Sequence, residues 1–415
     1  MLIKQGIHCH IIKTNKFKDI GISIRFLSKL DENHASEKSL LAMILCDRTL
    51  AYPTKKAMSE VSDECYGASL NAQTMGYGQA QVLEIRSKII DPDYVPNENL
   101  LEKHIAFLHE IIFNPRIDEE VMKEAKEVLL AKMQRMHDEP SQYAIHRCLQ
   151  LAGANIALGI SALGTKEKIE TITLEQLRNA YDDMIKNDQI ELLICGDINQ
   201  TKIQELIYNH LNFEERNSSI DTFYVSKNKE LGRIEEYRDV SQTNIMMLYF
   251  TNVSIKDDDY WKLKVTNAIL GQYPTSFLFQ EVREKNSLCY SIYSSLISYD
   301  GAMGISTGIE KVNINKTIEL IEKQVERIKQ GDFDELLLNT SKGMLINSLR
   351  QSLDDMNSLF SINFQNAILK QNKEVSDFIE AIEKVSKEDV IKVMKNSTHQ
   401  LTYILTSQEE QHVEN

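Results

Sequence analysis

The chain has 415 residues, of which 42% are hydrophobic and 26% charged, and its formal net charge is −14. A chain of this length is longer than one hydrophobic core usually accommodates, so at least two domains are expected. The acidic balance argues against a nucleic acid as the main partner, and no apolar run is long enough for a membrane-spanning helix. The N-terminal residues lack the apolar core of a signal peptide, and the six cysteines contain no C-x-x-C pair, so we expect a cytoplasmic protein with reduced thiols.

The predicted elements occur twice in the same order. An alternating strand at residues 19–26 is followed by an apolar helix at 36–46, and the same pair recurs at 243–250 and 260–271. In both copies a helix, a turn and a strand follow, then an amphipathic helix, a long helix and a closing strand. The period of about 200 residues indicates a duplicated domain rather than short repeats.

The duplication sets the predicted fold and domain limits. We expect an α+β protein of two homologous domains, each an antiparallel-rich sheet of about six strands with helices packed on one face. The most polar internal connection spans residues 214–232, which we interpret as the linker. The N-terminal domain is then predicted at 1–213 and the C-terminal domain at 233–415.

Several segments resemble one enzyme family. They are "TLAYPT", "YGASLNAQT", "IIFNPRIDEEVM" and "SFLFQEVREKNSLCYSIYSS". Together they resemble the pitrilysin/insulinase family of zinc peptidases, which includes the mitochondrial processing peptidases, and the resemblance covers almost the whole chain. It implies a clamshell of two similar domains.

The zinc motif of this family is missing. Family members place His-x-x-Glu-His on the first helix and a further Glu on the long helix, where they hold zinc and a water of pKa near ~7. Counting from Pro53, the motif falls on residues 39–43, so Ser39, Ala42 and Met43 stand at its functional positions. The second Glu is replaced by Lys132, with Ala125 as its neighbour at the usual acidic position. We therefore expect no metal on this chain.

Two near-matches to metal sites have simpler explanations. His34 and Glu37 have His-x-x-Glu spacing, but Lys38 stands where the last His belongs, so a polar loop entering the helix is the preferred interpretation. His8 and His10 share one strand face without a recognisable third ligand, which favours a solvent-facing strand.

Two further features of the family are retained. Arg283 ends a helix and Tyr290 follows seven residues later on a strand, with Ser287 where the family normally has a turn glycine. The resemblance implies that this pair holds substrate backbone near the scissile bond; otherwise Arg283 neutralises a helix dipole and Tyr290 packs. The second feature is the strand containing Ser69, Leu70, Asn71 and Ala72, which in active relatives adds an extended peptide and otherwise is only structural.

The resemblance also suggests a function. Some bacterial family members work as pairs in which one chain carries zinc and the other the Arg/Tyr pair. This chain is expected to be the non-catalytic, substrate-positioning subunit of a heterodimeric zinc metalloprotease that processes or degrades peptides, inactive without a partner carrying His-x-x-Glu-His. Two alternatives stay open: an inert scaffold or peptide-binding protein, self-associating or alone, and an active protease with displaced ligands such as His34 and Glu37.

Overall fold

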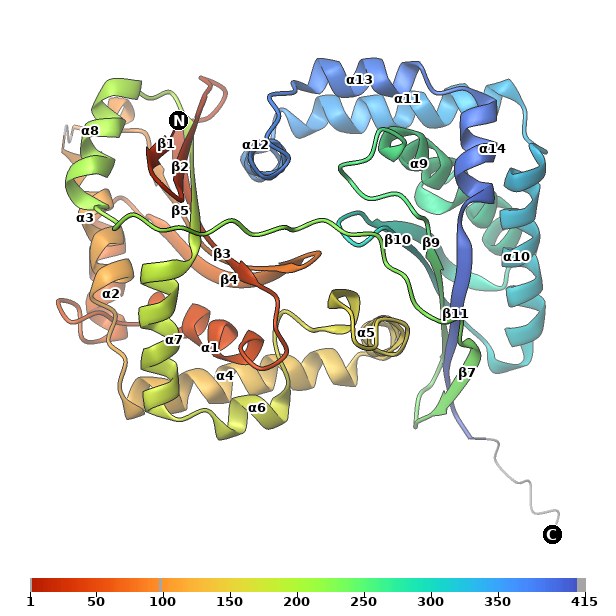
Figure 1. Ribbon diagram of the computed structural model, residues 1–415, viewed down its shortest axis with the longest axis horizontal. Helices are drawn as coiled ribbons and strands as arrows, with labels where there is room; N and C mark the ends of the chain where they lie inside the picture. Colours follow the sequence, from red (N-terminus) through yellow and green to blue (C-terminus); the bar gives the residue numbers. More distant parts are fainter. Residues whose placement is uncertain (1, 97–98, 409–415) are drawn as a thin grey trace, which may run out of the picture. The chain divides into compact units, whose positions relative to one another are not determined.

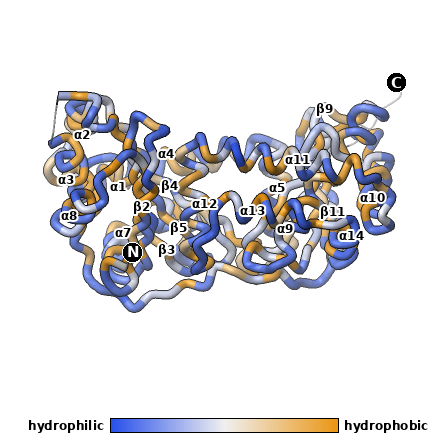
Figure 2. The backbone as a smooth tube through the Cα atoms, turned by 90° about the horizontal axis from the view of Figure 1, so that it is seen from above, coloured by the Kyte–Doolittle hydropathy of each residue, from blue (hydrophilic) through white to orange (hydrophobic). Residues whose placement is uncertain are grey.

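Figure 1 shows the computed structural model, which describes residues 2–96 and 99–408. The chain forms two compact units. Unit 1 contains Met1–Met133, Ile160–Thr222 and Ser352–Asn372, and unit 2 contains Gln134–Gly159, Phe223–Gln351 and Lys373–Asn415. Figure 2 shows hydrophilic and hydrophobic residues alternating along the backbone, as elements with one buried and one exposed face require.

Unit 1 is built on a six-stranded sheet in the order β1-β2-β6-β3-β5-β4. β2 and β6 run parallel, and every other neighbouring pair is antiparallel. The strands are β1 (Leu2–Lys4), β2 (Ile7–Lys13), β3 (Asp19–Lys29), β4 (Ser69–Tyr77), β5 (Ala80–Ile90) and β6 (Gln189–Gly196).

Unit 2 is built on a five-stranded sheet in the order β7-β11-β8-β10-β9. Its one parallel pair is β7 with β11. The strands are β7 (Gly232–Tyr237), β8 (Thr243–Phe250), β9 (Cys289–Ile297), β10 (Ala302–Ile309) and β11 (Thr398–Thr406). Five strands of each sheet correspond in order and direction, with β1 as the additional strand of unit 1, so the predicted α+β class and the duplication are confirmed.

Helices cover the sheets. Those of unit 1 are α1 (Ala35–Leu45), α2 (Lys55–Glu64), α3 (Leu100–Phe113), α4 (Glu119–Asp138, whose last residues are assigned to unit 2), α6 (Lys166–Thr171), α7 (Leu174–Asn187), α8 (Gln200–His210) and α12 (Met356–Ile368). Those of unit 2 are α5 (Pro140–Ala152), α9 (Tyr260–Asn267), α10 (Ile314–Gln330), α11 (Glu335–Ser352), α13 (Val375–Glu383) and α14 (Lys387–Lys395), with π-helical turns η3 (Ala268–Gln272) and η4 (Phe279–Lys285). Short 3-10 turns lie at η1 (Pro92–Tyr94), η2 (Ala157–Gly159) and η5 (Lys311–Asn313). Among the described helices, none is long and apolar enough to cross a membrane.

The two units exchange helices. α5 comes from the N-terminal half, yet its Ala144 and Cys148 pack in one core with Leu248 and Tyr403 of the second sheet. α12 comes from the C-terminal half, yet its Phe360 and Phe364 pack against Leu193 of the first sheet. Each sheet therefore has helices on both faces, whereas the prediction placed them on one. The predicted limits at 213 and 233 stay a prediction about the repeat along the sequence, and each compact unit contains segments from both sides of them.

Candidate functional site

Arg283 lies in the π-helical turn η4 of unit 2. Its guanidinium is stacked 4.5 Å from the centre of the Phe279 ring, and its Nε lies 3.3 Å from Glu284. The side chain keeps 40% exposure. Single π-helical turns are frequent at functional sites, and this one presents Arg283 to solvent on a base formed by an aromatic ring. Phe279 was not singled out from the sequence, although its i, i+4 spacing from Arg283 indicates such a contact.

The turn after η4 retains a left-handed backbone at Ser287. This residue has φ of +51°, in the region that favours glycine. Ser287 N donates to Arg283 O at 3.0 Å, the 5→1 bond of an αL helix end, and Leu288 N donates to Val282 O at 3.2 Å. The replacement of the family's turn glycine by Ser287 therefore leaves a glycine-like turn, which leads directly into β9.

Tyr290 sits in a β-bulge of the edge strand β9. Thr307 of β10 is opposite Ile292 and Ile309 is opposite Cys289, so two residues of β9, Tyr290 and Ser291, face the single residue Gly308. A bulge breaks the alternation of side chains and redirects one of them. Tyr290 is 91% exposed as a result. Bulges depend on pairing with another strand, so the sequence contained no signal for this one.

The arrangement brings the two predicted residues onto adjoining elements. Arg283 and Tyr290 flank a short turn, and the Arg283 charge reaches Cys289, next to Tyr290: burial raises the Cys289 pKa while Thr307 and Arg283 oppose the rise. A guanidinium and a phenol presented to solvent beside an open strand edge supply hydrogen-bond donors for a peptide carbonyl. Neither group can activate water by itself.

Ser39, at the first position of the lost zinc motif, is buried and held by hydrogen bonds. Ser39 is 1% exposed, and its Oγ donates to Ala162 O at 2.8 Å and lies 2.8 Å from Thr74 Oγ1. Gln81 Nε2 donates to the same carbonyl at 2.7 Å. The loop around Ala162 approaches α1 so closely that a Cβ added to Gly164 would lie 2.0 Å from Ser36 Oγ. A histidine side chain at position 39 has no room in this packing.

The remaining motif positions also fail to fit zinc. Ala42 is buried and Met43 packs against the core of unit 1, so α1 serves as a core helix. Lys132 is half-exposed on α4, where Ala125 is buried. Within residues 2–96 and 99–408, no group of three or more His, Cys, Asp or Glu side chains could hold a metal ion. The side chains present therefore do not fit the family's zinc site.

The near-match at residues 34–38 is the start of α1. His34 bonds Asp31 at 3.0 Å and its side chain is 72% exposed. Lys38 points inward, where its Nζ is bonded to the buried Asp188 and lies 2.5 Å from Ser28 Oγ. This part of the chain is a helix entry, as the simpler interpretation predicted, and the buried ion pair of Lys38 with Asp188 is an addition that the sequence did not indicate.

The strand with His8 and His10 is not simply solvent-facing, which corrects the prediction. His8 Nδ1 and His10 Nε2 lie 2.9 and 2.7 Å from the two carboxylate oxygens of Glu191 in β6. Burial alone would raise the Glu191 pKa, but the hydrogen bonds from both histidines outweigh it and lower the pKa to about 2. The partner lies far along the chain, so it could not be identified from the strand itself.

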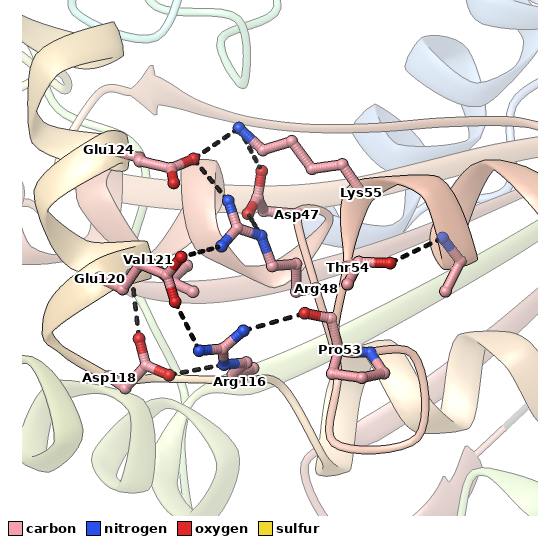
Figure 3. A network of polar contacts seen from close by, with 11 residues as sticks. Asp47, Arg48, Pro53, Thr54, Lys55, Arg116, Asp118, Glu120, Val121 and Glu124 are labelled. Atoms are coloured by element: carbon pink, nitrogen blue, oxygen red, sulfur yellow. Dashed lines mark hydrogen bonds and ion pairs between the residues drawn. The ribbon is translucent and has the colours of Figure 1, made fainter.

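Two of the family-like segments form a polar network that is independent of zinc (Figure 3). Arg48 Nη2 lies 2.5 Å from Glu124 of α4, and Lys55 bonds the same carboxylate at 2.7 Å. Arg116 Nη1 donates to Pro53 O at 2.9 Å, while Thr54 Oγ1 accepts from Ala57 N and caps α2. These contacts join the segment after α1, which contains "TLAYPT", to the segment that leads into α4, which contains "NPRIDEE". This structural role explains why both segments are present without a metal.

The second predicted binding element is also an edge strand. Ser69, Leu70, Asn71 and Ala72 begin β4, the last strand of the first sheet. Ser69 and Asn71 are exposed, whereas Ala72 is buried and Leu70 packs against the core. β4 and β9 occupy corresponding edges of the two sheets, and α1 is bonded to β4 through Ser39 and Thr74.

The fold and these sites define a two-unit, peptidase-like protein whose zinc-ligand positions are occupied by other residues. Comparison with known proteins agrees with this description. Residues 171–345 match the family model described as the peptidase M16 inactive domain. The chain is 28% identical over 411 residues to a probable inactive metalloprotease, YmfF, of Bacillus subtilis, covering 97% of this chain and 96% of that protein. It is 25% identical over 299 residues to an uncharacterized zinc protease, YmxG, of the same organism, covering 70% and 72%.

Solved structures show the same relationship. A conserved protein from Enterococcus faecalis superposes with a TM-score of 0.91 at 27% identity and covers 99% of this chain and 98% of its own. A Helicobacter pylori protease shares the fold, with a TM-score of 0.80 at 15% identity and coverage of 98% of both chains. The chain is thus similar to inactive members of the M16 peptidases over residues 171–345 and, at 27–28% identity, to proteins of the same fold over almost its whole length.

Proposed function

We propose that this chain is the substrate-positioning subunit of a two-chain zinc protease that processes or degrades peptides in the cytoplasm. The observation that carries the proposal is the presentation of Tyr290. A bulge exposes this tyrosine at a strand edge, next to a π-helical turn that holds Arg283 on Phe279. An exposure of 91% means that Tyr290 does not pack against the core, so packing does not explain its position.

The partner in this proposal is a homologous chain that carries His-x-x-Glu-His. It would supply the zinc and the general base, because the side chains of this chain do not fit that site. Arg283 would hold a carbonyl of the bound peptide, and Tyr290 would donate a hydrogen bond to the oxygen that becomes negative during attack. The peptide backbone would lie along a free strand edge, through hydrogen bonds that demand little of its sequence.

The test is reconstitution with a zinc-motif chain of the same family. This chain alone is expected to cleave no peptide, and the mixture is expected to show zinc-dependent cleavage. Arg283→Ala and Tyr290→Phe should each lower kcat/KM by about 10²-fold, as loss of one donor to an oxyanion does. Arg350→Ala and Tyr208→Phe, which alter exposed side chains elsewhere, serve as matched controls and should leave it unchanged.

Two results would overturn the proposal. One is full activity of the mixed complex after removal of both Arg283 and Tyr290. The other is recovery of only self-associated chain when the protein is isolated with its partners, which would favour the scaffold alternative.

A further inference from the structure

The outer edge of β7 is open in the second sheet. In the first sheet the corresponding strand, β2, is covered by β1, which pairs antiparallel with it. No described strand lies beside β7 on its outer side, and the five-stranded sheet ends there. Open edges are usually covered, twisted or charged, because their free N–H and C=O groups are ready to pair.

The pairing of β7 with β11 determines which backbone N–H and C=O groups of β7 point away from the sheet. Arg238 N donates to Thr406 O at 2.9 Å, where the parallel pairing of β7 with β11 ends. Successive residues of a strand direct their N–H and C=O groups to opposite sides. Gly232, Ile234 and Glu236 therefore face β11, and Arg233, Glu235 and Tyr237 present their groups to the open edge.

The side chains beside this edge carry both charges. Arg233, Glu235 and Tyr237 are exposed on one face of β7, where Arg233 Nε donates to Glu235 Oε1 at 2.9 Å and Tyr237 OH donates to Glu235 Oε2 at 3.0 Å. A hollow of about 1530 Å³ borders the strand. Its lining includes these three side chains, Lys311, and Val312, which is 88% exposed.

A second copy of β7 is complementary to the first in one register. If two copies pair antiparallel with Ile234 opposite Ile234, the outward groups of residues 233 and 235 of one copy meet those of residues 235 and 233 of the other. In the same register Arg233 of each copy lies opposite Glu235 of the other, and opposite charges at directly facing positions stabilise a pair. Shifting the axis to residue 233 would place Arg233 opposite itself, and shifting it to residue 235 would place Glu235 opposite itself.

We propose that two copies of this chain associate through β7, centred on Ile234, to form one continuous ten-stranded sheet across a two-fold axis. β7 and β9 are opposite edges of the five-stranded sheet, so the association leaves Arg283 and Tyr290 accessible. The proposal is therefore independent of the proposed function, and either can fail alone.

The first experiment measures the oligomeric state of the full-length chain by sedimentation velocity over a range of concentrations. The wild-type chain should show a concentration-dependent dimer. Arg233→Glu places like charges opposite each other and should weaken dimerisation by at least about tenfold, the effect of 1.4 kcal/mol. The double variant Arg233→Glu/Glu235→Arg exchanges the charges and should restore it, while Lys56→Glu, in an exposed pair of unit 1, controls for the change in net charge.

The second experiment tests the register. Ile234→Cys should give a disulfide-linked dimer under oxidation, because facing residues of an antiparallel pair are about 5 Å apart, within the span of a disulfide. Val312→Cys, an exposed position off the strand, is the control and should cross-link much less. A chain that remains monomeric at every concentration overturns the proposal. So does a dimer that tolerates Arg233→Glu, or a double variant that stays dissociated.

Discussion

Ser287 shows at the residue scale how the turn before the candidate site is kept without glycine. Its φ of +51° costs a side chain about 1 kcal/mol, because Cβ crowds the neighbouring carbonyl. The hydrogen bonds from Ser287 and Leu288 to the end of η4 hold it there. Ser287 therefore replaces the family's glycine at a cost in backbone strain, while the turn keeps a conformation that glycine favours.

Relieving this strain should stabilise the chain. Ser287→Gly is expected to raise the free energy of unfolding by about 0.5–1 kcal/mol, since the relief exceeds the entropy that glycine loses on folding. Ser295→Gly, at an exposed extended position of β9, is the control and should lower it by a similar amount. Urea unfolding of both variants measures the difference, and equal destabilisation by the two would show that the turn is not strained.

At the scale of elements, His104 links α3 by hydrogen bonds to β5 and, through Ser87, to the edge strand β4. It is fully buried, and its Nε2 lies 2.6 Å from Ser87 Oγ of β5. Ser87 Oγ in turn donates to Ser69 O at 3.0 Å, so its proton is used and Nε2 of His104 must donate. Nδ1 is then the unprotonated, accepting nitrogen, and it has no hydrogen-bond partner among the described residues. Burial lowers the His104 pKa to about 4.

This histidine makes stability depend on pH. Between pH 6.5 and 4 the unfolded chain binds a proton at His104 that the folded chain does not. The free energy of unfolding should therefore decrease by about 3 kcal/mol as the pH is lowered through this window. His104→Gln keeps a donor and removes the titration, so its stability should be less pH-dependent. Unfolding free energies from pH 7 to pH 4 measure this, with the exposed His34→Gln as control. Identical pH profiles for His104→Gln and the wild-type chain would contradict the assignment.

At the scale of the whole molecule, the exchanged helix α12 completes the core of unit 1. The Arg25 guanidinium, which pairs with Glu84 at 2.9 Å inside the sheet, stacks 4.2 Å from the centre of the Phe364 ring. Gly21 lets the helix approach, since a Cβ there would lie 2.3 Å from Met356 Sδ. α12 therefore covers a face of the first sheet that is both apolar and charged.

Truncating this contact should loosen unit 1. Phe364→Ala is expected to destabilise the chain by about 3–5 kcal/mol, and amide exchange should increase in α12 together with β3 and β6. Ser361→Ala, on the exposed side of α12, is the matched control and should have little effect. Increased exchange of α12 together with α11 and α13, with an unchanged first sheet, would show that the helix belongs to unit 2.

Much of this protein follows from local patterns. The repeated order of strands and helices follows from periodicity. The missing zinc ligands at Ser39, Ala42, Met43 and Lys132, and the candidate pair Arg283 and Tyr290, follow from the resemblance of short segments to a known family. The helix exchange, the bulge at Tyr290, the closure of Ser39 by Ala162 and the pairing of His8 and His10 with Glu191 required the tertiary structure. Each depends on contacts with residues outside its own segment, most of them far away along the chain, and no local pattern specifies those partners.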